Sequence, residues 1–458
     1  MSVKKKVMLI SCGSGRKNLF GNAQLPNLGL LYIATTFQDS GFDVEVVDLG
    51  LAPLAMEEIL DKTKTCNFVG VSCMTWTLDE ANKIASAIRA KNPNVGLIAG
   101  GSGATSMPSY LIPNFDWVCI GEGENAVRAI VGGKQAKGIV HTDRDMAWTG
   151  VLYPSRDKGM LPFLHMRDIW PLEIGDQAPT SISGSRGCPF DCSFCESREA
   201  WQGRVVFRDP IKVVDEVEYL AGQGYRSIDW DDLNINLNHE WLLAICAEMV
   251  NRGLHNKVVM GGLFNPALHH SDELIPAMRE AGWGMLSIGT ESPTERERQV
   301  MAKQHQDEDP DAIFKLCLKN GIATRLLMII DVPDQTINDI GRCGDWIKSC
   351  SATGFRCSHF TPFHQSASGR DDIIRSMIID HNLAHWDTVH PVLSVPYDSV
   401  AARRYLMESF FFNAYLKNRK ILLEKFPEFK IGYRRLESES GFLTKNNLVL
   451  PENRLGKG

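Results

Sequence analysis

The sequence has 458 residues, of which 44% are hydrophobic and 23% are charged, and its formal net charge is −6. A chain of this length can form two or three domains that each bury a core of their own. No segment approaches the ~20 consecutive apolar residues of a membrane span, and the first apolar run is too short and strand-like for a signal peptide. Nothing is similar to a nucleic-acid-binding module. We therefore expect a cytoplasmic protein that binds neither membranes nor nucleic acids.

The charge is unevenly distributed along the chain. From Ala401 to the last residue there are six Lys, six Arg, six Glu and no Asp, so this region carries +6 and the remainder −12. Solvated faces of amphipathic helices explain such a distribution, and an anionic substrate or partner is the alternative. In a reducing compartment the twelve cysteines are expected to be core residues or metal ligands rather than a disulfide framework.

The first third of the chain alternates between short apolar runs, rich in β-branched residues, and segments of helical length. The predicted strands are Val7–Ile10, Val44–Val47, Val69–Met74, Val95–Ile98 and Val118–Ile120, and the clearest helices span 28–38, 78–90 and 124–131. This alternation predicts a doubly wound parallel sheet of five strands in a domain that covers residues 1–136. Ligands of such sheets bind at the carboxyl ends of the strands.

Residues 137–177 lack a sustained period and are interpreted as a linker. A second alternating series follows, with strands expected at 180–185, 227–230, 258–260, 285–288, 324–330 and 356–360. Six βα units over residues 178–370 predict a partial (β/α)6 barrel that is open on one side and has its site at the strand carboxyl ends. Residues 371–458 are predicted to be helical and to form a cap over this barrel.

Three closely spaced cysteines follow the first strand of the second series. Cys188, Cys192 and Cys195 are separated by three and two residues, a spacing that fits a short loop around one 4Fe–4S cluster. Three ligands for four irons leave one iron with an open position, as a catalytic metal requires. The alternative is a zinc site completed by a distant histidine, although structural zinc favours paired Cys-x2-Cys units.

This cysteine motif, with Phe194 before its last member, resembles that of the radical S-adenosylmethionine (SAM) superfamily. The resemblance extends over about residues 178–365. It implies that the open iron binds the amino and carboxylate groups of the methionine part of SAM. An electron from the reduced cluster then breaks the S–C5′ bond and gives a 5′-deoxyadenosyl radical.

Further positions agree with the resemblance because they lie in order at successive strand ends. The aspartates after the second strand correspond to contacts with the amino end of SAM, the turn after the fourth strand to its ribose, and the fifth strand to its adenine. The implied SAM-binding residues are Phe194, Asp231, Asp232, Glu291, Ser292 and Ile330. Asp331 stands where the family usually has a glycine.

A doubly wound sheet in front of such a barrel resembles the cobalamin-binding domain of cobalamin-dependent radical SAM enzymes. Glycines at the strand ends would let the backbone approach a corrin and its nucleotide tail. The implied cobalamin-binding residues are Leu28, Gly29, Ser72, Thr75, Trp76, Gly100, Gly101, Ser102, Gly121, Glu122, Gly123 and Glu124. The first histidine of the chain is His141, so we expect no imidazole below the cobalt; Met74, Thr75 or Trp76 would face it instead.

The resemblance therefore implies a radical SAM methyltransferase that acts on an unactivated carbon of a small molecule and receives electrons from a donor such as flavodoxin or ferredoxin. One alternative is a ring contraction or cyclisation without methyl transfer, and another is a radical SAM enzyme with a vestigial front domain. A metal-stabilised binding module is disfavoured by the aspartates and the Glu291–Ser292 turn. A tRNA methylthiotransferase is disfavoured because the front domain has no cysteine cluster and no basic RNA-binding module follows.

Overall fold

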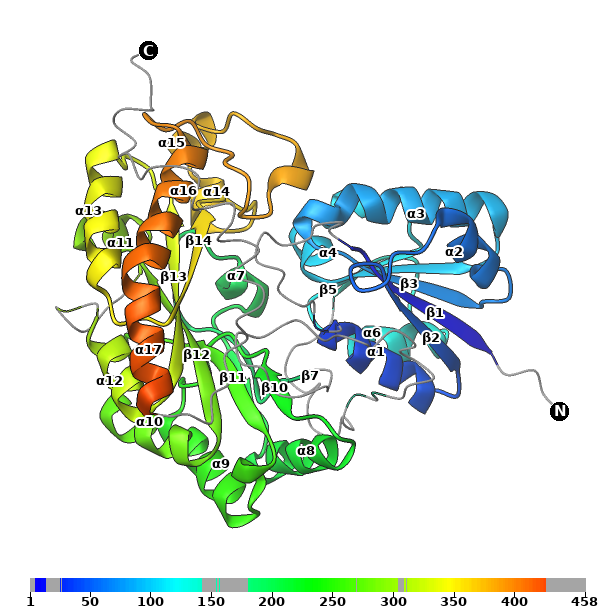
Figure 1. Ribbon diagram of the computed structural model, residues 1–458. Helices are drawn as coiled ribbons and strands as arrows, with labels where there is room; N and C mark the ends of the chain where they lie inside the picture. Colours follow the sequence, from blue (N-terminus) through cyan, green and yellow to red (C-terminus); the bar gives the residue numbers. More distant parts are fainter. Residues whose placement is uncertain are drawn as a thin grey trace. The chain divides into compact units, whose positions relative to one another are not determined.

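The computed structural model describes residues 5–13, 25, 27–141, 154, 156, 180–268, 270–303, 309 and 311–425 (Figure 1). These residues form two compact units. The first contains everything described before residue 170 together with Glu199–Gly203 and Asn382–Asp387, and the second contains the rest. Within the described ranges no helix has the length and apolar character needed to cross a membrane.

The sheet of the first unit has six parallel strands in the order β2-β1-β3-β4-β5-β6. Their bounds are β1 Lys6–Ser11, β2 Asp43–Asp48, β3 Phe68–Ser72, β4 Gly96–Gly100, β5 Trp117–Ile120 and β6 Gly138–His141. The doubly wound sheet is confirmed, but the predicted number of five strands is wrong. The sixth strand pairs with β5 and lies at the start of the predicted linker. Only four residues long, it carries too little periodicity to be recognised.

Both faces of this sheet are covered by helices. The elements between the strands are α1 Leu28–Asp39, α2 Met56–Thr63, η1 Thr75–Thr77, α3 Leu78–Lys91, α4 Ser102–Ser106, α5 Pro108–Leu111 and α6 Gly123–Val131. Alternation along β1 separates the two cores: Val7 and Leu9 pack with α1 and α6, whereas Met8 and Ile10 pack with α2 and α3. A short segment from later in the chain, η3 Leu383–His385, packs against η1 and α3.

The second unit contains an open sheet of six parallel strands in the order β14-β13-β12-β11-β10-β7. Their bounds are β7 Thr180–Ile182, β10 Ser227–Trp230, β11 Val259–Phe264, β12 Trp283–Glu291, β13 Ala323–Ile330 and β14 Gly354–His359. In the described residues β7 and β14 do not pair with each other, so the predicted partial barrel is confirmed. A separate antiparallel pair, β8 Ser185–Gly187 and β9 Val205–Phe207, was not predicted.

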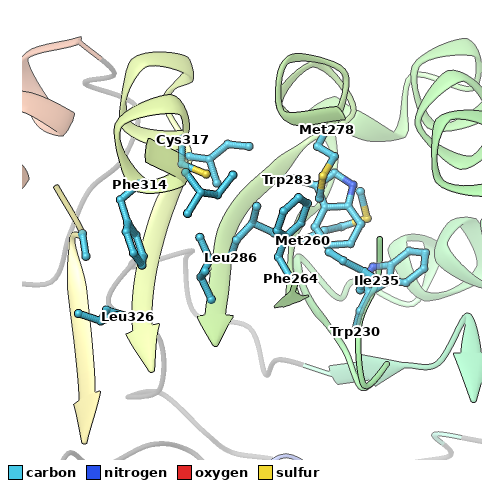
Figure 2. Close-up of a cluster of buried hydrophobic side chains, with 14 of the residues drawn as sticks. Trp230, Ile235, Met260, Phe264, Met278, Trp283, Leu286, Phe314, Cys317 and Leu326 are labelled. Atoms are coloured by element: carbon cyan, nitrogen blue, oxygen red, sulfur yellow. The ribbon is translucent and has the colours of Figure 1, made fainter. Parts of the chain in front are cut away.

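Helices pack on one face of this sheet and bury a large apolar core. They are α8 Pro210–Gly222, α9 His239–Asn251, η2 Leu254–Asn256, α10 Ser271–Glu280, α11 Glu295–Val300, α12 Ala312–Asn320, α13 Ile337–Ser349 and α16 Ser399–Ser409. As far as their residues are described, three short helices do not contribute to this core: α14 Ala367–Arg370, α15 Asp372–Ser376 and α7 Ser197–Trp201, of which Glu199–Trp201 belongs to the first unit. Figure 2 shows Trp230, Phe264 and Trp283 of the strands packed against Met278 of α10. The rings of Trp230 and Trp283 lie 5.1 Å apart.

The C-terminal helices belong to this outer layer, so the expected cap over the barrel is wrong. Helix α16 continues through the π-helical segment η4 Phe410–Tyr415 into α17 Leu416–Lys425, beside α13 (Figure 1). Leu406 and Phe410 are fully buried in the same core as the apolar side chains of α13. The aromatic residues of η4 that are buried, Phe410 and Tyr415, belong to this core. Residues 426–458 of the predicted helical region lie outside the described residues.

Two adjacent glycines at the end of β4 differ in what surrounds them. Gly101 has φ +96°, and a Cβ there would lie 2.5 Å from the carbonyl oxygen of Cys73, whereas a Cβ on Gly100 would meet nothing within 4 Å. We expect Gly101→Ala to lower the free energy of unfolding of the first unit by ~1–3 kcal/mol through backbone strain. Gly100→Ala should change it by less than about 0.5 kcal/mol. Denaturant titration checks both, and equal destabilisation would contradict the assignment.

Candidate active site

The antiparallel strands β8 and β9 flank the segment that carries the three cysteines. Strand β8 ends at Gly187, where φ is +97°. A Cβ there would lie 2.0 Å from the carbonyl oxygen of Arg204, the residue before β9. Only glycine fits at position 187, so the pairing of β8 with β9 fixes the direction in which Cys188 leaves the strand. Cys188 is buried, and Cys192 and Cys195 are half-buried. All twelve cysteines of the chain are free thiols.

The cysteine loop is anchored by residues far away in the sequence. The main-chain N–H of Ser193 donates to the carbonyl of Met301 at 2.9 Å, and its hydroxyl donates to the carbonyl of Val300 at 3.1 Å. The ring of Phe194 packs edge-on against Phe360, with 6.5 Å between their centroids. The loop is therefore held in place by the segment after α11 and by the segment after β14.

Polar and charged groups surround the three thiols. Burial raises the pKa of the Cys192 thiol to about 11, and the Lys303 ammonium acts in the opposite direction. Asn234 donates to the sulfur of Cys188 at 3.4 Å, and the N–H of Ser197 donates to the sulfur of Cys195 at 3.4 Å. Such thiols become thiolates when they bind a metal, and N–H donors stabilise thiolate sulfur.

The spacing of the sulfurs argues against a single zinc ion. Among the described residues the three cysteine sulfurs do not all lie within 4.8 Å of one another. Thiolates on one tetrahedral zinc, with bonds of ~2.3 Å, would be roughly 3.8 Å apart. A larger cluster accommodates the wider arrangement. The three cysteines therefore fit an iron–sulfur cluster better than the zinc alternative.

Asp232 holds the main chain that leads to the cysteines. Its carboxylate accepts from the N–H of Gly184 at 2.8 Å and from both the N–H and the hydroxyl of Ser185. The side chain is 3% exposed. The sequence predicted a contact of Asp232 with the amino end of SAM, but both of its carboxylate oxygens accept hydrogen bonds from Gly184 and Ser185.

Asp231, also at the end of β10, remains available. Its side chain is exposed to solvent at this strand end. Protein nevertheless surrounds it closely enough that lost solvation raises its pKa to about 6, an effect that Arg186 opposes. A carboxylate in a concave, partly desolvated position binds an ammonium group more strongly than one on an open surface.

Glu291 enters the site through an irregularity in β12. The register of β12 with β13 shifts between Gly289 and Glu291, and Glu291 has φ +63°. Such bulges redirect a side chain at the end of a strand. The buried carboxylate pairs with the Lys303 ammonium, with 3.4 Å between oxygen and nitrogen. Burial raises the pKa of Glu291, and Lys303 opposes that shift.

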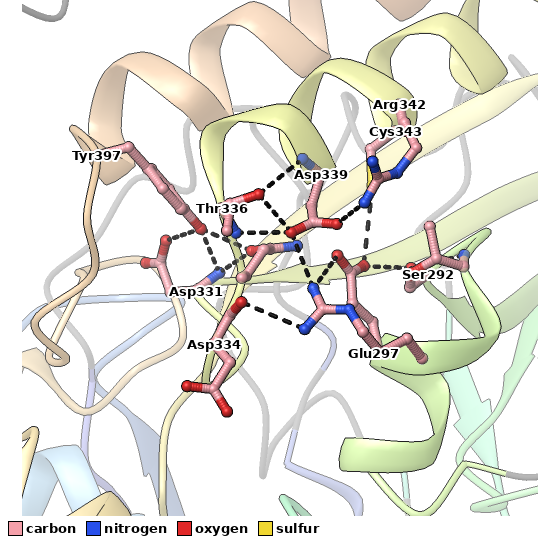
Figure 3. A network of polar contacts seen from close by, with 12 residues as sticks. Ser292, Glu297, Asp331, Asp334, Thr336, Asp339, Arg342, Cys343 and Tyr397 are labelled. Atoms are coloured by element: carbon pink, nitrogen blue, oxygen red, sulfur yellow. Dashed lines mark hydrogen bonds and ion pairs between the residues drawn. The ribbon is translucent and has the colours of Figure 1, made fainter.

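Ser292, the second residue of the predicted ribose-binding turn, has a different environment. It is fully buried, and its hydroxyl donates to the carboxylate of Glu297 (Figure 3). Its carbonyl accepts from Arg298 at 2.9 Å. The structure thus places Ser292 behind the turn, where it supports Glu291 through the main chain.

The end of β13 explains why an aspartate replaces the usual glycine. Asp331 has φ +63°, a conformation that Asp tolerates better than most residues. Its carboxylate contacts His359 Nδ1 at 2.7 Å. It also accepts from the hydroxyl of Tyr397 at 3.1 Å (Figure 3). The side chain of Ile330 lies in the core and its carbonyl accepts from Phe360 at 2.7 Å, so Ile330 could contact a ligand only through the main chain.

In the first unit, Asn27 ties three strand ends together and was missed by the sequence analysis. Its side-chain amide donates to the hydroxyls of Ser11 and Ser72 at 3.3 Å each, and its N–H donates to Asp48 at 3.3 Å. It also caps α1 by accepting from Leu30. An asparagine before an apolar run is a recognisable helix start, but only the fold shows that it also joins the ends of β1, β2 and β3.

The glycines predicted to approach a corrin fall into two groups. Gly100 faces open space, and a Cβ on Gly29 would meet only Asn27, at 3.5 Å. In contrast, Gly101 is required by its contact with the loop after β3, and a Cβ on Gly123 would lie 2.7 Å from Ile33. Gly29 and Gly100 therefore leave space where a side chain would otherwise stand, whereas Gly101 and Gly123 are required by the packing of the unit.

The other predicted residues of this unit line the same strand ends or support them. The exposed residue is Ser102, those at least half-buried are Ser72, Trp76, Gly121 and Glu122, and those fully buried are Leu28, Thr75 and Glu124. Trp76 lies in η1, directly after β3.

Histidine is not excluded from this unit in the way that the sequence suggested. Residues 1–140 contain none. However, the unit gains Asn382–Asp387 from the later part of the chain, and His385 of η3 comes with this segment. Because η3 packs against η1, which carries Trp76, a histidine distant in sequence belongs to the same unit.

Comparisons with known families agree with this division of the chain. Residues 22–131 match the B12 binding domain. Residues 182–347 match the radical SAM superfamily. The first match covers the carboxyl ends of β2 to β5, and the second contains the three cysteines and the ends of β10, β12 and β13.

Similar proteins share both regions. An uncharacterised methyltransferase of Pyrococcus horikoshii is 24% identical over 431 residues, which cover 88% of this chain and 90% of that protein. The anaerobic magnesium-protoporphyrin IX monomethyl ester cyclase of Rubrivivax gelatinosus is 25% identical and covers 70% of this chain and 61% of that protein. The structure of the radical SAM methyltransferase TsrM of Kitasatospora setae has a TM-score of 0.62 at 20% identity, covering 80% of this chain and 75% of TsrM.

The role assigned to Asp232 leads to a prediction. Asp232→Ala leaves the buried N–H groups of Gly184 and Ser185 without an acceptor, at a cost of ~1–3 kcal/mol for each. We expect a corresponding loss of unfolding free energy and a lower iron content after anaerobic reconstitution. Asp231→Ala, the matched control, should retain both. Denaturant titration and iron analysis measure the outcome, and normal iron binding by Asp232→Ala would contradict the assignment.

The two units correspond to two known domains, with the B12 binding domain before the radical SAM domain in the sequence. A doubly wound sheet with open glycine ends is followed by an open barrel whose cysteine loop suits a cluster. The matched families cover the same two regions. The chain therefore belongs to the cobalamin-dependent radical SAM enzymes.

Proposed function

We propose that this enzyme transfers a methyl group from SAM to an unactivated carbon of a small molecule. The observation that carries the proposal is the B12 binding domain in front of a radical SAM domain, in a chain similar along most of its length to a methyltransferase. When bound, the cluster and cobalamin supply the reductive cleavage of SAM and the carriage of the methyl group. The protein contributes binding, orientation and exclusion of water.

In this proposal the residues of the second unit divide the work. Cys188, Cys192 and Cys195 hold the cluster. Asp231 accepts from the ammonium group of SAM, and Glu291 accepts from its ribose hydroxyls. The charge of Glu291 is offset by Lys303 at 3.4 Å, so the carboxylate can stay ionised in a buried position.

The proposal includes partners and surroundings. The substrate is a small molecule, and an anionic one would suit the basic region after Ala401. We propose that the electron comes from a donor such as flavodoxin or ferredoxin. The twelve free thiols support a reducing compartment such as the cytoplasm.

A radical cyclisation without methyl transfer is the second candidate. The similarity to magnesium-protoporphyrin IX monomethyl ester cyclases, at 25% identity over 351 residues, favours it specifically. Because both reactions begin with the same cofactors, the fate of the methyl group of SAM distinguishes them.

Deuterium labelling tests the proposed reaction. Reconstituted enzyme is incubated with SAM deuterated on its methyl group and a small-molecule extract from cells that lack the gene, and the products are analysed by mass spectrometry. We expect a product that carries the intact deuterated methyl group. A new product without the label would favour cyclisation. The variant with Cys188, Cys192 and Cys195 all replaced by Ala should lose the cluster of about four irons and four sulfides and form no product.

The environment of cobalt gives a separate prediction. We expect the electron paramagnetic resonance (EPR) spectrum of bound cob(II)alamin to lack nitrogen superhyperfine splitting, because Trp76 would cover the lower face. Trp76→Ala should open that face to an axial ligand and slow methyl transfer more than it weakens binding. His385→Ala is the control. Splitting that is present in the wild type and absent in His385→Ala would contradict the prediction and identify this histidine as the ligand.

A further inference from the structure

Lys303 is held beside the cysteine loop by the main chain. Its N–H donates to the carbonyl of Arg298 at 2.8 Å, and the preceding Ala302 adopts φ +50°. The same turn supplies the carbonyls of Val300 and Met301 to which Ser193 donates. The backbone that carries Lys303 is therefore bonded directly to the loop between Cys192 and Cys195.

The side chain of Lys303 is buried against Glu291. The two side chains are 11% and 10% exposed, and the nitrogen lies 3.4 Å from the nearer carboxylate oxygen. A Cβ on Gly289 would lie 2.6 Å from that oxygen and 3.1 Å from the Lys303 nitrogen. Gly289 thus leaves the space that the pair occupies, which indicates a position built for this ion pair.

Lys303 also acts on the cysteines themselves. Burial lowers the pKa of the Lys303 ammonium, but Glu291 and then Cys192 and Cys188 raise it, with a net increase. A second group, the Asn234 amide, donates to the sulfur of Cys188 at 3.4 Å. Lys303 therefore presents a positive charge, and Asn234 a neutral N–H donor, to the thiolates of the proposed cluster.

We propose that Lys303 sets the reduction potential of the cluster, because its fixed ammonium group stabilises the reduced form. Reduction adds one electron to a centre already surrounded by three thiolates, and nearby positive charge in a poorly solvated site favours that addition. Asn234 acts in the same direction. The inference rests on the proposed function only in that the three cysteines hold a cluster.

An anaerobic redox titration of the reconstituted full-length enzyme, without SAM or substrate, tests the inference by EPR of the reduced cluster. At a fixed potential, Lys303→Met should lower the ratio of reduced to oxidised cluster about tenfold, which corresponds to ~59 mV for one electron. Lys303→Arg should stay near the wild type. Lys315→Met is the control, because Lys315 is an exposed lysine on α12 paired with Asp309.

Glu291→Gln distinguishes a direct effect from one through the ion pair. If Lys303 acts on the cluster directly, Lys303→Met lowers the ratio by the same factor in the wild-type and Glu291→Gln backgrounds. If the effect disappears in the Glu291→Gln background, Lys303 is only a counter-ion and the inference is overturned. Asn234→Leu should also lower the ratio, by a smaller factor.

Iron content separates the remaining outcomes. Should Lys303→Met assemble too little cluster to titrate, Lys303→Gln replaces it, and an unchanged potential in a neutral variant with wild-type iron content overturns the inference. A wild-type protein that assembles no cluster would instead refute the proposed function. A shifted potential in a protein that transfers no methyl group would leave the inference standing.

Discussion

The geometry of the site depends on one buried carboxylate. Asp232 is almost fully buried at the end of β10, and a buried carboxylate must be compensated by hydrogen bonds. The N–H groups of Gly184 and Ser185 likewise require an acceptor where β7 gives way to β8. Each need satisfies the other, and the pairing of β7 with β10 brings the two together. The position from which the cysteine loop departs follows from that bond set.

Around the loop, non-glycine residues adopt left-handed conformations at strand and helix ends. Glu291, Ala302 and Asp331 all have φ between +50° and +63°. Such conformations cost free energy and persist where surrounding bonds enforce them. Asp331 contacts His359 and Tyr397. Figure 3 shows the polar contacts that lie between Asp331 and Ser292. Two of these strained conformations occur at the carboxyl edge of the barrel, where β12 ends at Glu291 and Asp331 follows β13.

In the first unit the corresponding edge is organised by neutral groups. Asn27 links Ser11 and Ser72 and bonds to Asp48, so three strand ends share one amide side chain. Glycines next to this centre have two separate roles, since Gly101 permits two loops to pack and Gly100 leaves open space. Whether a glycine leaves room for a ligand or permits close packing depends on what a Cβ at that position would meet.

The sequence by itself determined the fold class and the two-part organisation, and it singled out the three closely spaced cysteines, because strand–helix periodicity and cysteine spacing are local properties. It also located the strand ends on which Asp231 and Glu291 lie. Tertiary structure decided which of these side chains are already engaged by other parts of the protein. Asp231 and Asp232 are indistinguishable in sequence. Only Asp232, however, accepts hydrogen bonds from the main-chain N–H groups of Gly184 and Ser185, about 47 residues earlier. Lys303, Asn234, Asn27 and His385 carry no local signal of their roles, because each acts through groups that only folding brings near.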